Sequence, residues 1–173
     1  FILWGPPGCG KTTIARIIGE QPGIRFFAIS AVYDGVAELR KVFRQVEEVS
    51  LLTSTSILFV DEIHRFNRGQ QDALLSAIED GLLRLIGATT ENPSFSLNAA
   101  LLSRTQVLTL NPLDEDALEA LLKRAADHIK RPLPLEATAR EKLLQLADGD
   151  GRYLLNLAEI LYDQPEATTL NTE

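Results

Sequence analysis

The chain is poor in sulfur: its 173 residues include one cysteine, Cys9, and no methionine. A single cysteine cannot form an internal disulfide, and this composition is typical of a reducing compartment. No apolar run approaches the roughly 20 residues that cross a bilayer, and no basic segment with a cleavage site opens the chain. We therefore expect a cytoplasmic protein with neither a disulfide framework nor a membrane span.

The start of the sequence is also unusual, because the apolar run of residues 1–4 begins without Met. We expect the chain to be a piece of a longer protein with a segment upstream. It contains no internal repeat and no low-complexity tract. Its 45% hydrophobic and 24% charged residues are ordinary for a globular protein, and the length suits one domain with a small satellite.

Negative charge dominates, with a net charge of −7, but it is unevenly distributed. Residues 1–111 carry 10 basic and 11 acidic side chains, whereas residues 112–173 carry 7 and 13. The second segment, at net −6, is not expected to follow a nucleic-acid backbone. Any DNA contact must therefore come from local basic clusters in the first segment.

Strand-like and helix-like patterns alternate in residues 1–111, which predicts a parallel α/β sheet. The expected strands are residues 1–4, 24–30, 56–61, 84–89 and 106–110. The expected helices are residues 13–19, 36–52, 68–80 and 98–103. In the longest of these helices the apolar side consists of Val36, Leu39, Val42 or Phe43, Val46 and Val49.

The pattern changes after Pro112, where Asp114 is a good helix N-cap. Helical spacing then covers about 114–129, 136–148 and 151–163, and predicts a small all-α bundle over residues 112–163. The predicted apolar stripes are Ala117, Leu118, Leu121, Leu122, Ala125 and Ile129, then Leu143, Leu144, Leu146 and Ala147, then Leu154, Leu155, Leu157, Ala158 and Leu161. The polar tail, residues 164–173, is expected to be flexible.

A glycine-rich loop between the first strand and the first helix carries the strongest chemical signal. It consists of Gly5, Pro6, Pro7, Gly8, Cys9, Gly10, Lys11, Thr12 and Thr13. The glycines let backbone N–H groups turn toward phosphate oxygens, and the helix N-terminus adds its dipole. Lys11 can reach the β- and γ-phosphates, and the Thr12 hydroxyl can bind Mg²⁺. The alternative is a glycine turn that only happens to precede a helix.

A second nucleotide signal follows about 50 residues later, where the apolar strand 56–61 ends in Asp61 and Glu62. This strand would deliver Asp61 to the carboxyl edge of the sheet, where it can hold Mg²⁺ through water. Glu62 would then be placed to orient and deprotonate an attacking water.

Four further residues have two interpretations each. His64 could sense the γ-phosphate or could simply pack. Thr90, after Thr89 at the end of a strand, could position the lytic water or be an ordinary β-branched strand end. Arg104 could be an arginine finger acting across a subunit interface, and Arg152 could reach the nucleotide. A solvated surface arginine is the alternative for both.

The order of these motifs resembles that of AAA+ ATPases, in the branch of clamp loaders and Holliday-junction motors. The chain is most similar to the replication-associated recombination protein RarA (MgsA) family, which is related to the Werner-helicase-interacting protein. The residues that carry this resemblance are 59–67, 70–75, 78–81, 87–95 and 98–104, and it covers about residues 1–163.

The resemblance implies roles for individual residues. Lys11 and Thr12 match Walker A, and Asp61 and Glu62 match Walker B. Thr90 matches sensor 1, Arg104 the trans-acting arginine finger, and Arg152 sensor 2.

It also implies a fold and a function. The fold would be a P-loop core with a five-stranded parallel sheet in residues 1–111, followed by a helical lid in residues 112–163. The function would be that of a homo-oligomeric, DNA-stimulated ATPase using ATP and Mg²⁺ at stalled or gapped replication forks. Single-stranded-DNA-binding protein would be a partner, and in a bacterium the protein would associate with the nucleoid.

The chain departs from the family pattern at Cys9, where threonine is usual, and at Tyr153-Leu154, where Arg-Ala is usual. Alkylation of Cys9 is expected to block ATP binding. The segment before Phe1, which helps to form the adenine pocket in the family, is absent from the sequence.

Two basic clusters could meet DNA. One is Arg65 and Arg68, which flank the start of a helix; the other is Arg40, Lys41 and Arg44, whose interspersed glutamates also fit a solvated face. Two different functions stay open. The chain could be a clamp-loader subunit or a branch-migration motor, or it could be a module that binds ATP as a switch without hydrolysing it.

Overall fold

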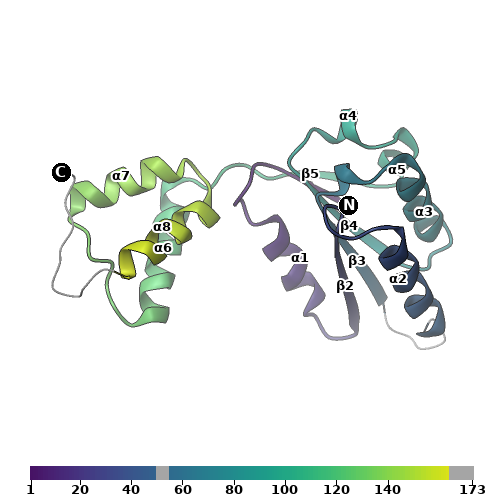
Figure 1. Ribbon diagram of the computed structural model, residues 1–173, viewed down its shortest axis with the longest axis horizontal. Coiled ribbons are helices and arrows are strands. Elements are labelled where there is room, and N and C mark those ends of the chain that lie inside the picture. Colours follow the sequence, from purple (N-terminus) through teal and green to yellow (C-terminus); the bar gives the residue numbers. More distant parts are fainter. Residues whose placement is uncertain (50–54, 164–173) are drawn as a thin grey trace. The chain divides into compact units, whose positions relative to one another are not determined.

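The computed structural model describes residues 1–49 and 55–163. Contacts divide the chain into two units (Figure 1). The first unit contains Phe1–Gly5 and Lys11–Leu110, and the second contains Pro6–Gly10 and the chain from Asn111 onward. The predicted assignment of residues 1–111 and 112–163 to a nucleotide-binding domain and a lid stays a prediction. The predicted tail, 164–173, lies outside the described residues.

The first unit is built on a five-stranded parallel sheet, as the sequence predicts. Its strands are β1 (Ile2–Trp4), β2 (Ile24–Ser30), β3 (Thr55–Asp61), β4 (Arg84–Thr89) and β5 (Val107–Thr109), in the order β2-β3-β4-β1-β5. Leu3 on β1 lies opposite Ala88 on β4 and Leu108 on β5. The first strand of the chain therefore lies inside the sheet and joins strands that come much later in the sequence.

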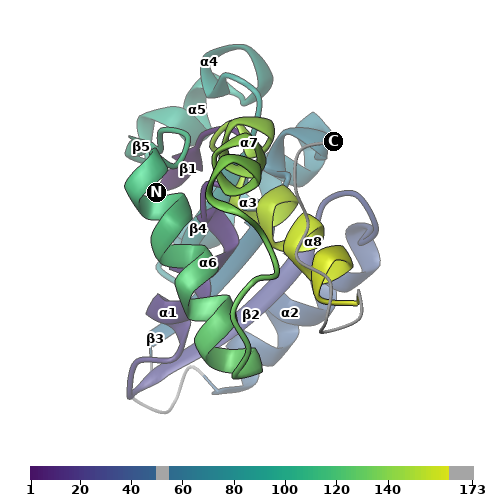
Figure 2. The same ribbon diagram turned by 90° about the vertical axis from the view of Figure 1, so that its left-hand side faces the viewer.

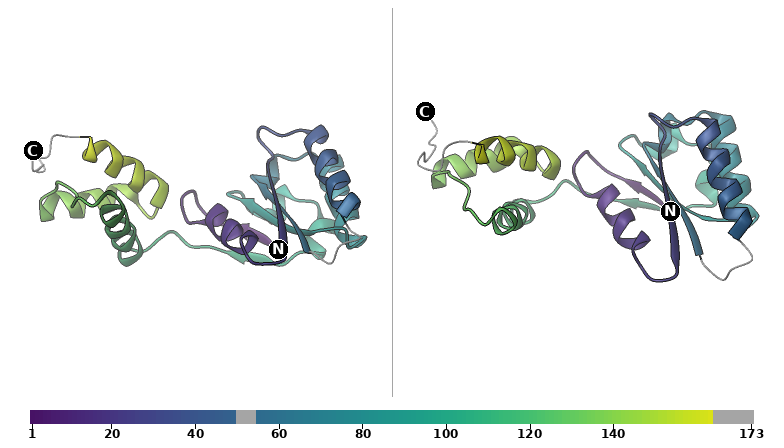
Figure 3. Two further views of the ribbon diagram at one scale, coloured as in Figure 1. Left: turned by 90° about the horizontal axis from the view of Figure 1, so that it is seen from below. Right: turned by 60° about the horizontal axis from the view of Figure 1, so that its bottom comes forward.

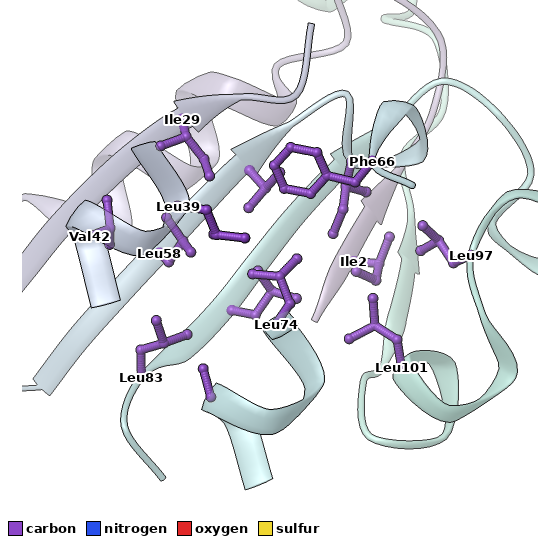
Figure 4. Packing of buried hydrophobic residues seen from close by; sticks show 14 of the residues in the cluster. Ile2, Ile29, Leu39, Val42, Leu58, Phe66, Leu74, Leu83, Leu97 and Leu101 are labelled. Carbon is purple, nitrogen blue, oxygen red and sulfur yellow. The ribbon is translucent and has the colours of Figure 1, made fainter. Parts of the chain in front are cut away.

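Helices cover both faces of this sheet (Figures 1 and 3). One face packs against α1 (Lys11–Gly19), and the other against α2 (Val36–Val49), α3 (Arg68–Glu79) and α5 (Ala99–Ser103). Figure 4 shows the core on the second face. Because both faces are covered, β3 is apolar at successive positions rather than at alternate ones.

Neighbouring strand residues divide between these two cores. Ile2, Leu58 and Leu85 face α2, α3 and α5, whereas Leu3 and Phe59 face α1. All five side chains are at least 95% buried. Each such side chain contributes about 1.5–3 kcal/mol relative to an exposed one.

Where the structure describes them, the predicted strands and helices of this unit occur within one or two residues of their expected bounds. Val36 is exposed, so the buried side of α2 begins at Leu39. The predicted continuation of this helix to Leu52 lies outside the described residues. All three residues of β5, the edge strand beside β1, are exposed.

Two short helices were not predicted, η1 (Ile63–Arg65) and α4 (Pro93–Ser96). They are too short to show a helical period. Local groups define α4, since the Asn92 side chain accepts a hydrogen bond from the Ser94 N–H and Pro93 occupies the first turn.

The second unit contains the three predicted helices, α6 (Glu115–Ile129), α7 (Ala137–Ala147) and α8 (Gly151–Tyr162) (Figure 2). Asp114 caps α6 by accepting from the Ala117 N–H at 2.8 Å, and Asp150 caps α8. Helix α8 packs against both α6 and α7. The buried side chains of this core are Leu118, Leu122, Leu133, Leu143, Leu144, Ala147, Leu154 and Ala158.

The predicted apolar stripes are wider than this core. Ile129, Leu146 and Leu155 are exposed, with 46%, 65% and 37% of their surface accessible. Leu146 follows the buried Leu144 by two positions and therefore lies on nearly the opposite side of α7. A three-helix unit of this size buries only a narrow face of each helix.

Candidate active site

Three of the predicted catalytic residues, Lys11, Glu62 and Thr90, lie at the carboxyl edge of the sheet, after β1, β3 and β4. The chain leaves β1 at Gly5, whose N–H donates to the Thr89 carbonyl at the end of β4 (3.2 Å). Asp61 ends β3 between β2 and β4. This edge is where parallel α/β sheets bind ligands.

Lys11 and Thr12 begin α1 at this edge. The Lys11 side chain is only 7% exposed, and its Nζ donates to the Gly5 carbonyl at 2.8 Å. The Thr12 hydroxyl donates to Asp61 Oδ2 at 3.5 Å. The structure thus brings together three of the residues predicted to bind phosphate and metal.

The loop before them shows why glycine is needed. Gly8 and Gly10 have φ angles of +66° and +93°, in the region where a side chain is strained. By its contacts, the loop segment Pro6–Gly10 groups with the second unit, in which the Gly151 N–H donates to the Gly8 carbonyl at 3.3 Å. Cys9 is buried in this segment. Arg152 is exposed in the first turn of α8, also in the second unit.

Glu62 has a left-handed backbone, with φ 52° and ψ 45°. This conformation is uncommon for a residue other than glycine and costs about 1–3 kcal/mol. It ends β3 and begins η1. As a result, two adjacent carboxylates separate: Asp61 meets Thr12, whereas Glu62 Oε2 accepts from the Thr90 hydroxyl at 3.3 Å. Glu62 and Thr90 therefore lie side by side.

His64 lies beside this pair and is almost enclosed, with 5% of its side chain exposed. Its Nδ1 is 3.2 Å from Glu62 Oε2 and 3.0 Å from Thr89 Oγ1. Its Nε2 is 3.5 Å from Glu91 Oε1. The sequence left His64 open between a sensor and a packing residue, and it did not single out Glu91.

The donor set at this edge fits a magnesium–nucleotide complex. Mg²⁺ prefers hard oxygen ligands, and it commonly takes only one or two from protein and the rest from water and phosphate. Thr12 and Asp61 supply two such oxygens, and Lys11 supplies a buried positive charge. No group of three or more His, Cys, Asp or Glu residues that could form a metal cage occurs in residues 1–49 and 55–163.

Arg104 ends α5 and is exposed. Its guanidinium forms an ion pair with Glu79 Oε1 at 3.0 Å and donates to Ser103 Oγ at 2.8 Å. Arg65 on η1 and Arg68 at the start of α3 are exposed as well. These three arginines are therefore surface groups rather than members of the cluster around Asp61 and Glu62.

Gln71 is a structural link whose role the sequence did not indicate. It is 4% exposed, and its side-chain amide donates to the Phe66 carbonyl at 2.9 Å and to the Ser96 carbonyl at 3.3 Å. Its carbonyl accepts from the Asn98 N–H at 2.8 Å. Gln71 thereby ties α3 to the segment that leads to Arg104. The sequence did contain a signal for this role, because Gln71 is a polar residue on the apolar side of the predicted helix 68–80.

Comparisons with known proteins identify the family of the chain. The family described as "ATPase family associated with various cellular activities (AAA)" matches residues 1–113. Replication-associated recombination protein A of Coxiella burnetii is 50% identical over 94% of this chain and 38% of its own length. ATPase WRNIP1 of Dictyostelium discoideum is 45% identical over 92% of this chain and 19% of its own. The resemblance inferred from the motifs is thereby confirmed.

A solved structure gives the same picture of the fold. A Lys-to-Arg variant of Thermotoga maritima RuvB superimposes with a TM-score of 0.76 and 29% identity, covering 99% of this chain and 58% of that one. The chain spans about two fifths or less of the curated relatives quoted above. Within its described part, no helix is both long and apolar enough to cross a membrane.

Proposed function

The chain belongs to the AAA family of ATPases, and from this premise we propose that it hydrolyses ATP with Mg²⁺ as part of an oligomer that acts on DNA. The observation that supports this most directly is the meeting of two pairs at one sheet edge. Thr12 lies beside Asp61, and Thr90 lies beside Glu62. A buried lysine accompanies them.

In this proposal, the loop and the start of α1 bind the phosphates. Lys11 Nζ exchanges the Gly5 carbonyl for phosphate oxygens, and Gly8 and Gly10 let the loop backbone approach closely. Thr12 and Asp61 would hold Mg²⁺, which neutralises charge on the β- and γ-phosphates when bound.

Glu62 is the proposed general base. A water oxygen attacks the γ-phosphorus, its proton passes to the Glu62 carboxylate, and the bond to the ADP oxygen breaks. Thr90 fixes one oxygen of that carboxylate. Arg104 of a neighbouring subunit would stabilise the transition-state charge, and Arg152 would link nucleotide state to the helical unit.

The first test is ATP hydrolysis per subunit in the full-length protein as its concentration rises. We expect the rate to climb with concentration because each site needs a neighbour. Glu62→Gln should retain ATP binding and lower hydrolysis by about 10²–10⁴-fold. Normal turnover in that variant would exclude Glu62 as the base.

A mixing experiment tests the contribution in trans. Glu62→Gln and Arg104→Ala are each expected to be inactive alone. Mixed oligomers should regain hydrolysis, because some interfaces then combine an intact Glu62 with an intact Arg104. Absence of any recovery in verified mixed oligomers would mean that Arg104 does not act across an interface.

Action on DNA at stalled or gapped replication forks is the proposed biological role, in the cytoplasm and with single-stranded-DNA-binding protein as a partner. The names of the relatives support a role in replication and recombination. Reversing Arg65 and Arg68 to Glu should weaken DNA stimulation and reduce its salt dependence. Reversing Lys123 and Arg124, which are exposed on α6 in the acidic second segment, changes the charge equally and is the matched control. Equal losses in both would indicate a general charge effect.

A branch-migration motor is the second candidate, because the order of the motifs also resembles that of Holliday-junction motors. Clamp loading is a third candidate, and ATP-gated binding without turnover is a fourth. Assays on Holliday junctions, sliding clamps and forks carrying single-stranded gaps separate these activities. ATP binding with no hydrolysis under any of these conditions would favour the switch.

A further inference from the structure

We propose that His64 is a positioning residue that holds the Glu62 carboxylate in place for proton transfer. The inference rests on the proposed ATP hydrolysis and adds a residue to its machinery. His64 itself touches neither water nor phosphate in this role. It acts through Glu62, whose Oε2 lies 3.2 Å from its Nδ1.

The backbone brings the two side chains together. The left-handed conformation of Glu62 ends β3 and turns the chain into η1. This turn brings the side chain of His64 back to that of Glu62, with 3.2 Å between Nδ1 and Oε2. Ile63 anchors this turn and is fully buried. Gly87 makes room for it on β4, because a Cβ there would lie 3.0 Å from Ile63 Cδ1 and 2.7 Å from Ile2 Cδ1.

The hydrogen-bond pattern identifies the donor. The Thr89 hydroxyl has one proton, which it can donate to the Glu91 carbonyl at 3.2 Å, and its oxygen accepts from the Glu91 N–H at 3.0 Å. An acceptor position is left on that oxygen for His64 Nδ1, 3.0 Å away. The Glu62 carboxylate can only accept, so its 3.2 Å contact favours the tautomer with the proton on Nδ1, which both Glu62 Oε2 and Thr89 Oγ1 can accept.

The result is an asymmetric carboxylate. Glu62 Oε2 receives the Thr90 hydroxyl and the His64 N–H. Within the described chain, Glu62 Oε1 has no hydrogen-bond partner, and 30% of the Glu62 side chain is exposed. One oxygen is held while the other is available to a water proton. Without His64, the side chain of a glutamate on a strained turn could rotate, and a displacement of about 1 Å can lower a rate about 100-fold.

The burial of His64 separates this role from the two that the sequence left open. A sensor of the γ-phosphate needs an outward-facing nitrogen, but only 5% of the side chain is exposed. A packing histidine needs no contact with a catalytic carboxylate. Its second nitrogen, Nε2, lies 3.5 Å from Glu91 Oε1, a longer contact than either of those made by Nδ1. The short contacts of the ring are those of Nδ1.

The test compares two substitutions of His64 in the full-length protein. His64→Leu removes the donor, whereas His64→Asn places an amide nitrogen near the position of Nδ1. We expect His64→Leu to lower kcat by roughly 10- to 100-fold with KM and nucleotide affinity unchanged, and His64→Asn to recover most of this loss. His128→Leu, at an exposed site on α6, is the matched control. An unchanged kcat in His64→Leu, or equal losses in both His64 variants, would overturn the proposal.

A double substitution tests whether His64 acts through Glu62. In a Glu62→Gln background, His64→Leu should cause little further loss of kcat, because residues that act as a unit are not additive. A full additional loss would show that His64 acts elsewhere. Absence of hydrolysis in the wild-type protein would instead refute the proposed function itself. If the wild-type protein is active and His64→Leu has the same kcat, only the positioning role is refuted.

Discussion

The two units use the same uncommon backbone conformation for different purposes. In the described chain, three residues other than glycine have positive φ: Glu62 in the sheet unit, and Lys130 and Asp148 in the helical unit. Lys130 and Asp148 end α6 and α7, and their N–H groups bond to the Ala126 and Leu144 carbonyls. Glu62 instead separates two carboxylates at the end of a strand. The left-handed backbone of Lys130 and Asp148 is explained by the helix ends that they form. That of Glu62 ends no helix, and backbone strain without a structural explanation points to a functional site.

Buried polar groups differ between the units in the same way. The sheet unit buries Lys11, Gln71 and Thr89, whereas the core of the helical unit is built from leucine and alanine. We therefore expect substitutions in the leucine and alanine core of the helical unit to change stability alone, and substitutions around β3 and β4 to change stability and hydrolysis together. Four predictions test this contrast, from the largest expected effect to the smallest.

Leu154→Ala should destabilise the helical unit by about 2–5 kcal/mol, because Leu154 is fully buried in its core. Hydrogen exchange measured by mass spectrometry should show lost protection in α6, α7 and α8 but not in the sheet. The neighbouring Leu155→Ala, at a residue 37% exposed, should cost much less. Loss of protection spread over both units would refute their independence.

Gly87→Ala should destabilise the sheet unit by about 1–3 kcal/mol, because the added Cβ would overlap Ile2 and Ile63. Since Ile63 anchors η1, ATP hydrolysis should fall as well. Thermal unfolding and steady-state rates measure the two effects. Gly69→Ala, where a Cβ meets only a side-chain oxygen at 3.5 Å, is the control and should not destabilise. A Gly87→Ala variant with unchanged stability but slower ATP hydrolysis would mean that packing around Gly87 and the positioning of η1 are separable.

Lys130→Gly should stabilise the helical unit by up to about 1 kcal/mol, because glycine relieves the left-handed conformation at the end of α6. Lys123→Gly, at an exposed position inside the same helix, should destabilise by about 1 kcal/mol. Denaturant unfolding of both variants is the measurement. Destabilisation by Lys130→Gly would mean that the lysine side chain has a role beyond ending the helix.

The smallest effect concerns the ion pair between Arg140 and Glu119. Hydrogen bonds from Arg140, the shortest at 2.6 Å, lower the pKa of Glu119, and the same bonds raise the pKa of Arg140. Because the folded-state pKa of Glu119 lies below its unfolded value of about 4.5, the pair stabilises above that pH and is lost as the pH falls through the folded-state pKa.

Arg140→Gln should therefore flatten the acid limb of the stability curve below about pH 4.5. The pair is partly exposed, so the change should stay under about 1 kcal/mol. Unfolding measured between acid and neutral pH tests this, with Glu119→Gln as the matched variant. Additive effects in the double variant would show that the two residues do not act as a pair.

Patterns that depend on neighbours in the sequence predicted the fold well. The run Ile57-Leu58-Phe59-Val60 indicates a strand buried on both faces, and Asp114 indicates a helix start. Errors occur where burial depends on a partner element, as for Val36 and Leu146. The short η1 and α4 were missed because one or two local groups define them.

The candidate site divides in the same way. The loop up to Thr12 and the Asp61-Glu62 pair are local motifs that the sequence shows directly. The contact of His64 with Thr89 joins residues 25 positions apart and depends on how β4 lies beside β3 and on the left-handed turn at Glu62. The hydrophobic periodicity of the sequence predicts neither the placement of β4 beside β3 nor the left-handed turn at Glu62. Arg104 and Arg152 depend on a neighbouring subunit and on the second unit, so their roles stay predictions.

The internal position of β1 also affects how the chain folds during synthesis. Among the strands of the sheet, β1 is made first but pairs with β4 and β5, which end at Thr89 and Thr109. At about 5–20 residues per second, the apolar segment Ile2–Trp4 waits on the order of 5–20 s for these partners. During that time the nascent chain exposes it next to the ribosome. A hydrophobic segment that is translated early and paired late is a natural target for chaperones.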